Sequence, residues 1–178
     1  MGRRVALLRA VNVGGRNLPM AGLRELCEEL GWRDVRTYIQ SGNIVFEAPG
    51  SGKSLESALE RAISGRFSLD VPVVVRTSEQ WAKFIAANPF PRTAGEAPNR
   101  LQLILSKRTP AKGAAASLEA RAAAGERVAA AGGALWLCYP EGIARSRLTP
   151  ALIDKAVGSP ATARNYRTVL KLGEMLEA

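Results

Sequence analysis

The hydrophobic and polar positions of the first 76 residues alternate between short apolar runs and segments with apolar residues at helical spacing. Short runs bounded by glycine or proline predict strands, and apolar positions three and four residues apart predict helices. The predicted elements are a strand over 5–11, a helix over 19–30 that stops at Gly31, strands over 35–40 and 43–46 around a tight turn at Ser41-Gly42, a helix capped by Ser54, and a strand over 71–76. This β-α-β-β-α-β order is typical of a ferredoxin-like half.

From residue 77 onward the pattern echoes the first half only loosely. The predicted elements are a helix after a capping box at Thr77-Ser78-Glu79-Gln80, a strand over 101–105, an alanine-rich helix over 111–124, a hairpin of strands 127–131 and 134–139 around Gly132-Gly133, a helix from the cap Thr149 to Gly158, and a last helix with Arg164 and Asn165 in its first turns. The predicted fold class is α+β. Two ferredoxin-like halves, residues 1–76 and 77–178, are expected to pack as one compact unit, the second being an α/β half with a hairpin and two closing helices.

Composition adds a basic surface to this fold. Of 178 residues, 47% are hydrophobic and 23% are charged, and 25 Lys and Arg against 16 Asp and Glu give a net charge of +9. That charge favours anionic partners, although it serves solubility equally well. No apolar run approaches the roughly 20 residues that span a bilayer. We therefore expect a cytoplasmic protein without a membrane partner.

The reactive side chains of the sequence limit the kinds of catalytic and metal-binding site that the chain can form. The chain has no histidine, which removes the commonest general base and the commonest transition-metal ligand. Cys27 and Cys138 are predicted to be buried structural thiols, because two cysteines do not make a disulfide framework. The sequence therefore predicts neither a metal site nor a cofactor.

Four polar clusters stand at the ends of predicted elements, where a ligand can reach them. Glycines let backbone N–H groups approach an anion, and paired arginines can fork onto a phosphate or carboxylate. At a helix start, Arg164 would oppose the helix dipole, a cost that a bound anion would offset. Turn chemistry, helix capping and solvated charge are the alternative explanations. The candidate ligand-binding residues are Arg9, Asn12, Gly14, Gly15 and Asn17, then Gln40, Ser41 and Asn43, then Arg145, Ser146 and Arg147, and finally Arg164 and Asn165.

Segments from both ends of the chain together resemble a known family. They are RAVNVGGRNLPM at 9–20, DVRTYIQSGN at 34–43, NPF at 88–90, YPEGIARSR at 139–147 and TARNYRTV at 162–169. In this order they resemble the bacterial family called domain of unknown function 1697. The resemblance implies a stand-alone bacterial protein with two ferredoxin-like halves, and it implies no activity. Arg147 and Tyr166 depart from the family pattern, which has lysine and tryptophan there.

Three functions remain open on the sequence alone. The leading hypothesis is binding of a small anionic ligand, phosphorylated or carboxylated and including nucleotides, between the two halves. An RNA- or single-strand-binding module is an alternative that the charge supports and the 6% aromatic content opposes. A metal-independent enzyme for a phosphorylated substrate is another, with Ser41 or Ser146 as a nucleophile that lacks an evident base. The sequence indicates no oligomeric state.

Overall fold

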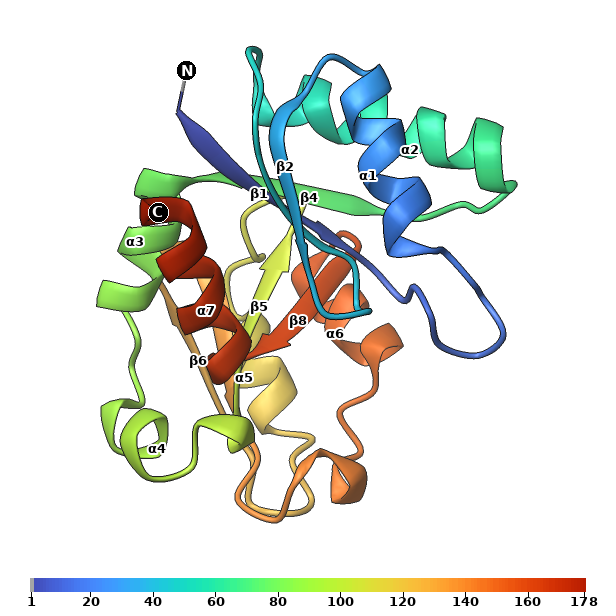
Figure 1. Cartoon of the computed structure of the whole chain (residues 1–178). Coiled ribbons are helices and arrows are strands. Elements are labelled where there is room, and N and C mark those ends of the chain that lie inside the picture. The colour runs from blue at the N-terminus through green and yellow to red at the C-terminus, as the bar shows by residue number, and fades with distance from the viewer. Residues whose placement is uncertain (1) are drawn as a thin grey trace. The chain divides into compact units, whose positions relative to one another are not determined.

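Two four-stranded antiparallel sheets and seven helices make up the computed structural model, which describes residues 2–178 (Figure 1). The predicted α+β class is confirmed. The chain divides into two compact units. The first unit comprises the chain up to Trp81 together with Leu172–Ala178, and the second unit comprises Ala82–Lys171. The C-terminal segment therefore belongs to the unit in which the chain begins.

The first unit has the predicted β-α-β-β-α-β order. Its elements are β1 (Arg3–Leu8), α1 (Met20–Glu29), β2 (Arg33–Tyr38), β3 (Asn43–Glu47), α2 (Gly52–Phe67) and β4 (Val73–Thr77). The strands lie in the order β2-β3-β1-β4, so β4 is an edge strand. Ser51 rather than Ser54 caps α2, because the Ser51 hydroxyl accepts the N–H of Ser54 at 3.2 Å and the helix starts earlier than predicted.

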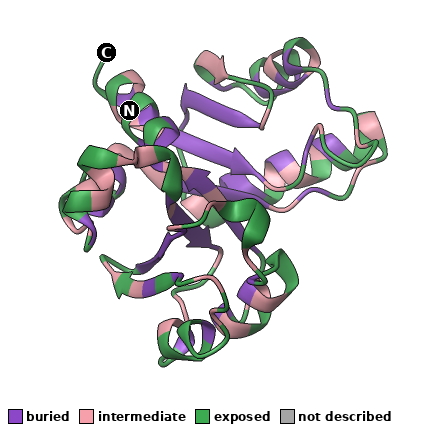
Figure 2. Cartoon of the chain, turned by 90° about the horizontal axis from the view of Figure 1, so that it is seen from below, coloured by how far each residue is buried: buried purple, intermediate pink, exposed green. Residues whose placement is uncertain are grey.

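Helices α1 and α2 form the core of the first unit with one face of its sheet. Leu23 of α1 and Leu59 of α2 are fully buried in the same cluster as Phe46, and the ring of Trp32 stacks on Phe46 with centroids 3.9 Å apart. Figure 2 shows strands that are largely buried and helices that are buried along one side. The C-terminal segment joins this unit through Arg36, whose Nη2 donates to the carbonyl oxygen of Met175 at 3.0 Å.

The second unit repeats the strand order of the first. Helices α3 (Ser78–Ala86) and α4 (Pro91–Glu96) precede β5 (Leu101–Ser106), α5 (Ala114–Glu119), β6 (Arg127–Ala131), β7 (Ala134–Cys138), α6 (Pro150–Val157) and β8 (Ala161–Asn165), and α7 (Tyr166–Glu177) follows. Its sheet has the order β6-β7-β5-β8, and α5 and α6 share a buried cluster with one face of that sheet. Within residues 2–178 no helix combines the length and the apolar character that crossing a membrane requires.

The structure corrects the predicted second half. Residues 161–165 form β8, so Arg164 and Asn165 are not part of the last helix, which begins at Tyr166. The sequence of β8 carries no apolar run, and its pairing with β5 decides its conformation. Helix α5 is shorter than the predicted 111–124, because alanine propensity alone sustains a helix poorly without packing. Helix α4 lies before the predicted strand over 101–105, in a segment for which the sequence pattern predicts no helix or strand.

Carboxylates accept backbone N–H groups of three edge strands. The pairs are Val73 with Glu60 (2.8 Å) and Val75 with Glu56 (2.9 Å) in β4, Val128 with Glu119 (2.9 Å) in β6, and Ala161 with Asp154 (3.0 Å) in β8. Glu56 and Glu60 come from α2, Glu119 comes from α5 and Asp154 comes from α6. An N–H group held this way is not available to pair with a strand of another chain.

Candidate functional site

The predicted site residues fall on both compact units. Arg9, Asn12, Gly14, Gly15, Asn17, Gln40, Ser41 and Asn43 lie in the first unit, and Arg145, Ser146, Arg147, Arg164 and Asn165 lie in the second. In the first unit they occupy two connections, residues 9–19 between β1 and α1 and residues 39–42 between β2 and β3, with Asn43 as the first residue of β3. We call these two connections the paired loops.

The side chain of Asn12 joins the paired loops. Its Oδ1 accepts the N–H of Leu18 at 2.8 Å, and its Nδ2 donates to the carbonyl oxygen of Leu18 at 3.0 Å. The same Nδ2 donates to the carbonyl oxygen of Gln40 at 2.7 Å. Because Leu18 is fully buried, Asn12 ties the neck of the first loop to the core and also to the tip of the β2–β3 hairpin.

Left-handed backbone is concentrated in the paired loops. Ala10, Asn12 and Ile39 have φ of 51°, 54° and 50°, a conformation that costs a non-glycine residue about 1–2 kcal/mol. Gly14 and Gly15 have φ of 59° and 81° at the centre of a turn closed by the N–H of Arg16 to the carbonyl of Val13 at 3.2 Å. Positive φ at both central positions makes this a type I′ turn, which glycine favours.

Two of the predicted residues shape the hairpin from within. Asn43 has no exposed surface, and its Nδ2 donates to the carbonyl oxygen of Tyr38 and to the Ser41 hydroxyl, each at 2.9 Å. Between them Gly42 has a φ of 74°, and a Cβ there would lie 2.6 Å from the Cβ of Leu8. Asn43 and Ser41 therefore stabilise the turn from within. The polar groups that the paired loops present to solvent belong to other residues of the two loops.

The outward groups of the paired loops are hydrogen-bond donors on stretches of sequence without acid. Neither 2–24 nor 35–46 contains an Asp or Glu. Within residues 2–178, the side-chain amides of the exposed Asn17 and Gln40 make no hydrogen bond, and the N–H groups of Gly14 and Gly15 make none either. Arg9 adds a half-buried guanidinium at the start of the first loop. This surface can donate several hydrogen bonds to one anion.

Two aliphatic side chains flank these donors, and sequence reasoning missed them. Val13 is 56% exposed in the first loop and Ile39 is 51% exposed in the second. In the sequence, Val13 stands next to Gly14 and Ile39 stands near the end of a predicted strand, and these positions were the signals that could have indicated exposed side chains. Singly exposed aliphatics are common, but here each borders one of the loops that Asn12 joins.

In the second unit, Ser146 holds a loop. Its hydroxyl donates to Oε1 of Glu126 at 2.5 Å and accepts the N–H of Leu148 at 3.1 Å. Glu126 is only 4% exposed and also accepts N–H groups of Ala123 and Ala124 through Oε2. Sequence reasoning missed Glu126, because a carboxylate just before a strand gives no distinctive pattern.

Glu126 is stabilised in its ionised form. Desolvation alone would raise the pKa of Glu126, but the hydrogen bonds from Ser146, Ala124 and Ala123 outweigh it and lower the pKa below its ordinary value. Ser146 and Glu126 together hold the loop.

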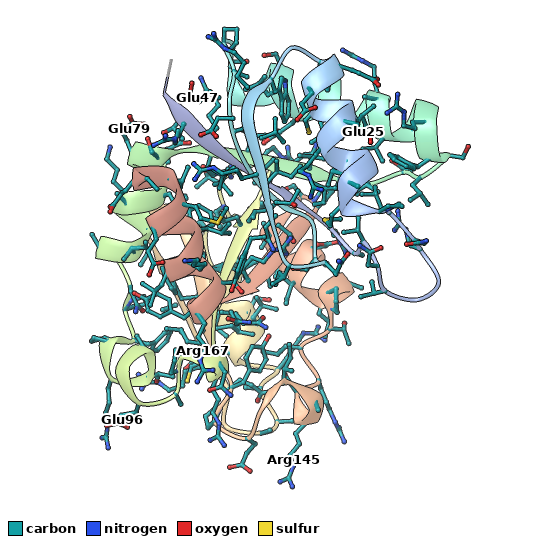
Figure 3. All side chains as sticks on the ribbon, viewed as in Figure 1. Glu25, Glu47, Glu79, Glu96, Arg145 and Arg167 are labelled. Atoms are coloured by element: carbon teal, nitrogen blue, oxygen red, sulfur yellow. The ribbon has the colours of Figure 1, made fainter. Side chains whose placement is uncertain are left out.

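The two arginines beside Ser146 are exposed. Arg145 points away from the ribbon (Figure 3) and forms an ion pair with Glu141, with Nη1 and Oε2 3.3 Å apart. Arg147 is exposed too. Because Arg145 already has a carboxylate partner, its charge is partly neutralised.

Arg164 and Asn165 have structural partners in and after β8. Arg164 is 8% exposed, and its Nη1 donates to Oγ1 of Thr162 and to the carbonyl oxygen of Ala163, both at 2.8 Å. Burial lowers the pKa of Arg164 to about 10, so its guanidinium stays charged at neutral pH. Asn165 accepts the N–H of Thr168 at 3.0 Å and so caps α7. Arg164 does not stand at a helix start, and its predicted conflict with a helix dipole was wrong.

The described residues 2–178 contain no group of three or more His, Cys, Asp or Glu placed to hold a metal ion. Cys27 is buried, and desolvation, with a smaller contribution from the charge of Glu28, raises the pKa of its thiol to about 12. A thiol with so high a pKa is protonated at neutral pH and is a poor nucleophile.

Comparison with known proteins gives a family and a fold. A family model described as "Protein of unknown function (DUF1697)" matches residues 1–136. Among curated proteins no significant sequence match is found. A solved structure described as that of a conserved bacterial protein from Streptococcus pneumoniae is 22% identical, with a TM-score of 0.80 over 100% of this chain and 99% of that chain. At this identity the likeness shows the fold alone.

Proposed function

The chain belongs to the DUF1697 family of proteins of unknown function, and from that premise we propose that it binds a small phosphorylated or carboxylated molecule at the paired loops of the first unit. The observation that carries the proposal is the hydrogen bonding of Asn12, which holds Leu18 twice within the first loop and the carbonyl oxygen of Gln40 once across to the second. It fixes two loops with free donors against each other before any ligand arrives. Preorganised donors lose little entropy on binding, which favours affinity.

Charge in these loops supports an anion over a neutral ligand. Arg9 and Arg16 lie in the first loop, and the chain from residue 2 to Arg24 contains no Asp or Glu. The guanidinium of Arg16 is tied to the carbonyl oxygen of Asp70, so it contributes charge while it braces the loop. Arg9, the amides of Asn17 and Gln40, and the N–H groups of Gly14 and Gly15 are the proposed contacts.

A stacking platform for single-stranded nucleic acid finds less support. Such modules place aromatic rings on an exposed surface. The exposed large hydrophobic residues within 2–178 are all aliphatic, namely Val13, Leu30, Ile39, Ile143 and Leu170. We therefore propose a small-molecule ligand, and binding of RNA is an outcome that the experiment separates.

The experiment is a thermal-shift screen of the full chain with nucleotides, sugar phosphates, small carboxylates and short RNA at low and high salt. We expect one small anion to raise the unfolding midpoint at both salt concentrations, because a ligand at 100 times its Kd adds about 2.7 kcal/mol. Arg9→Gln and the double variant Asn17→Ala with Gln40→Ala should abolish the shift. The matched controls Arg61→Gln and Asn99→Ala, both exposed and outside the loops, should keep it.

Two results would overturn the proposal. A shift that survives in the Arg9 and Asn17 variants would place the ligand elsewhere. A shift produced by RNA alone and lost at high salt would replace the small-molecule site with a polyelectrolyte surface, because phosphate contacts are strongly salt-dependent.

We further propose that both halves are ferredoxin-like and that the protein acts in the cytoplasm. The shared β-α-β-β-α-β order and the matching strand orders β2-β3-β1-β4 and β6-β7-β5-β8 support the first proposal. The second is supported by Cys27 and Cys138, which are both free and buried, as is usual in a reducing compartment.

A further inference from the structure

We propose that the second unit has a site of its own, a cavity between α5 and α6 that binds a small organic anion with an apolar body. The cavity has a volume of about 280 Å³ and is lined by α5, α6, the end of the β5–α5 connection and Arg121 just after α5. This volume is near the lower end of ligand pockets, which span roughly 300–1,000 Å³. The site shares no residue with the paired loops and does not rest on the function proposed for them.

The walls of the cavity are apolar on one side. Leu152 of α6 is half-buried and lines this side, whereas Leu118 of α5 is 1% exposed and offers almost no surface of its own, because it belongs to the buried cluster against which Leu152 packs. Ala156 completes this wall from α6. A hydrated inorganic ion gains nothing from such a surface, whereas an aromatic or short aliphatic group buries its own apolar area there.

The rim of the cavity is cationic. Lys112, Arg121 and Lys155 line it, and no acidic residue does. None of the ion pairs within residues 2–178 involves these three side chains. All three side chains are exposed, so solvent screens them from one another, and an anion that binds among them is attracted by three cations at once.

In the part of the chain that the structure describes, the acidic residues of the same two helices form no ion pair with these three side chains. Glu119 of α5 accepts the N–H of Val128 at 2.9 Å, and Asp154 of α6 accepts the N–H of Ala161 at 3.0 Å. Both carboxylates are thereby directed to strand edges. Lys155 lies in the last turn of α6 and Arg121 just after the C-terminus of α5, where a cation is favourable without any ligand, but that reason does not extend to Lys112, which precedes α5.

Charge and apolar wall together specify the ligand class. The rim fits a carboxylate or a phosphate ester, and the wall fits a body of one small ring or a short chain. Ser117, which also lines the cavity, can donate its hydroxyl to the same anionic group. A carboxylate and a phosphate monoester share this chemistry, so the experiment includes one of each.

The experiment is a titration of the full chain, followed by amide shifts in ¹H–¹⁵N NMR spectra. The probes are benzoate, phenyl phosphate, inorganic phosphate and benzyl alcohol. We expect saturable shifts from benzoate or phenyl phosphate, confined to Lys112–Arg121 and Leu152–Ala156. Inorganic phosphate and benzyl alcohol, which each lack one half of the ligand, should bind about tenfold more weakly or worse.

Variants test the wall and the rim separately. Ala156→Phe fills the cavity and should remove binding, whereas Ala151→Phe on an exposed position of the same helix should leave it unchanged. The double variant Arg121→Gln with Lys155→Gln should weaken binding at least about tenfold, and Lys53→Gln with Arg61→Gln should not. The charge variants keep the test decisive if Ala156→Phe fails to fold.

Three results would overturn the proposal. If inorganic phosphate binds as tightly as phenyl phosphate, the apolar wall contributes nothing to binding and the site is a basic surface patch. Shifts outside Lys112–Arg121 and α6 would locate the ligand elsewhere. Binding that persists in the double charge variant, or the absence of saturable shifts from both aromatic anions, would remove the site.

Discussion

The carboxylate of Glu56 accepts the backbone N–H of Val75 at 2.9 Å and so covers the edge of β4 with a buried charge from α2. The same oxygen lies 3.7 Å from Nη1 of Arg76, whose side chain is 16% exposed. Burial lowers the pKa of Arg76 and the charge of Glu56 partly restores it, so this ion pair is sheltered from solvent. One acidic side chain thus serves a strand edge and a buried cation together.

Replacing Glu56 should therefore be more harmful than replacing its helical neighbour Glu60. Glu56→Ala removes the acceptor of the Val75 N–H and the negative charge beside Arg76, and we expect the free energy of unfolding to fall by about 3–5 kcal/mol. Glu60→Ala removes one hydrogen bond to Val73 and should cost about 1 kcal/mol. Urea denaturation measures both. Equal losses would show that the buried pair with Arg76 contributes nothing.

The hairpin tip should reject any side chain at Gly42. In Gly42→Ala the new Cβ would meet Leu8 at 2.6 Å and Val11 at 2.7 Å in a left-handed conformation. Overpacking and backbone strain together predict a loss of about 3 kcal/mol or more. Gly133→Ala, with φ of 83° and no heavy atom within 4 Å of the new Cβ, should show the strain alone, about 1–2 kcal/mol. Similar losses in the two variants, measured by thermal unfolding, would contradict the clash.

Stability should decline in alkali because two buried acids resist ionisation. The pKa of Cys27 rises to about 12, and burial together with the charge of Glu126 raises the pKa of Tyr139. A folded pKa above the unfolded one gives stability that is complete below the unfolded value, near 8.5 for a thiol, and is lost as the pH rises toward the folded value. The slope is at most about 1.4 kcal/mol per pH unit and group.

Cys27→Ala and Tyr139→Phe should each flatten that alkaline decline. The measurement is the free energy of unfolding between pH 7 and pH 11, each variant being compared with its own value at pH 7, so that lost packing cancels. The Cys27 variant should diverge from the wild type first, since an unfolded thiol ionises before an unfolded phenol. Parallel curves for variant and wild type would mean that the thiol ionises freely in the fold.

Glu126 should make the protein sensitive to acid. Its folded pKa is lowered, so its stabilising contribution is present above the unfolded pKa of about 4.3 and is lost as the pH falls through the folded value. Glu126→Gln should flatten the decline in unfolding free energy between pH 6 and pH 3. Glu141→Gln, at a largely exposed carboxylate in the neighbouring loop, is the control and should keep the wild-type slope.

Local sequence signals correctly predicted the elements that depend on local contacts. Thr77 and Gln80 form the predicted capping box, with the N–H of Thr77 donating to Gln80 at 3.0 Å and the N–H of Gln80 donating to Thr77 at 3.2 Å. Thr149 caps α6 as predicted, and Gly132 and Gly133 turn the β6–β7 hairpin with φ of 63° and 83°. In each case the deciding partners lie within a few residues.

Long-range partners decided the rest. Residues 161–165 become β8 because β5 pairs with them, and no spacing within the segment reveals this. The link from Asn12 to Gln40 spans 28 positions, and the bond from Ser146 to Glu126 spans 20. The candidate residues could be named from turn and charge chemistry, but the partner of each required the fold. For the same reason the cavity between α5 and α6 left no trace in the sequence pattern.

The membership of Leu172–Ala178 in the first unit constrains how the protein is made. A ribosome releases residues 2–81 early, but the contact from Arg36 to Met175 can form only after 82–171 have also been synthesised. At about 5–20 residues per second, the first unit waits several seconds or longer for its last segment. The second unit, continuous in the chain, has all its residues before then. Translation thus leaves the N-terminal unit incomplete until residues 172–178 have been synthesised, and a chain that stops before them would lack part of the unit made first.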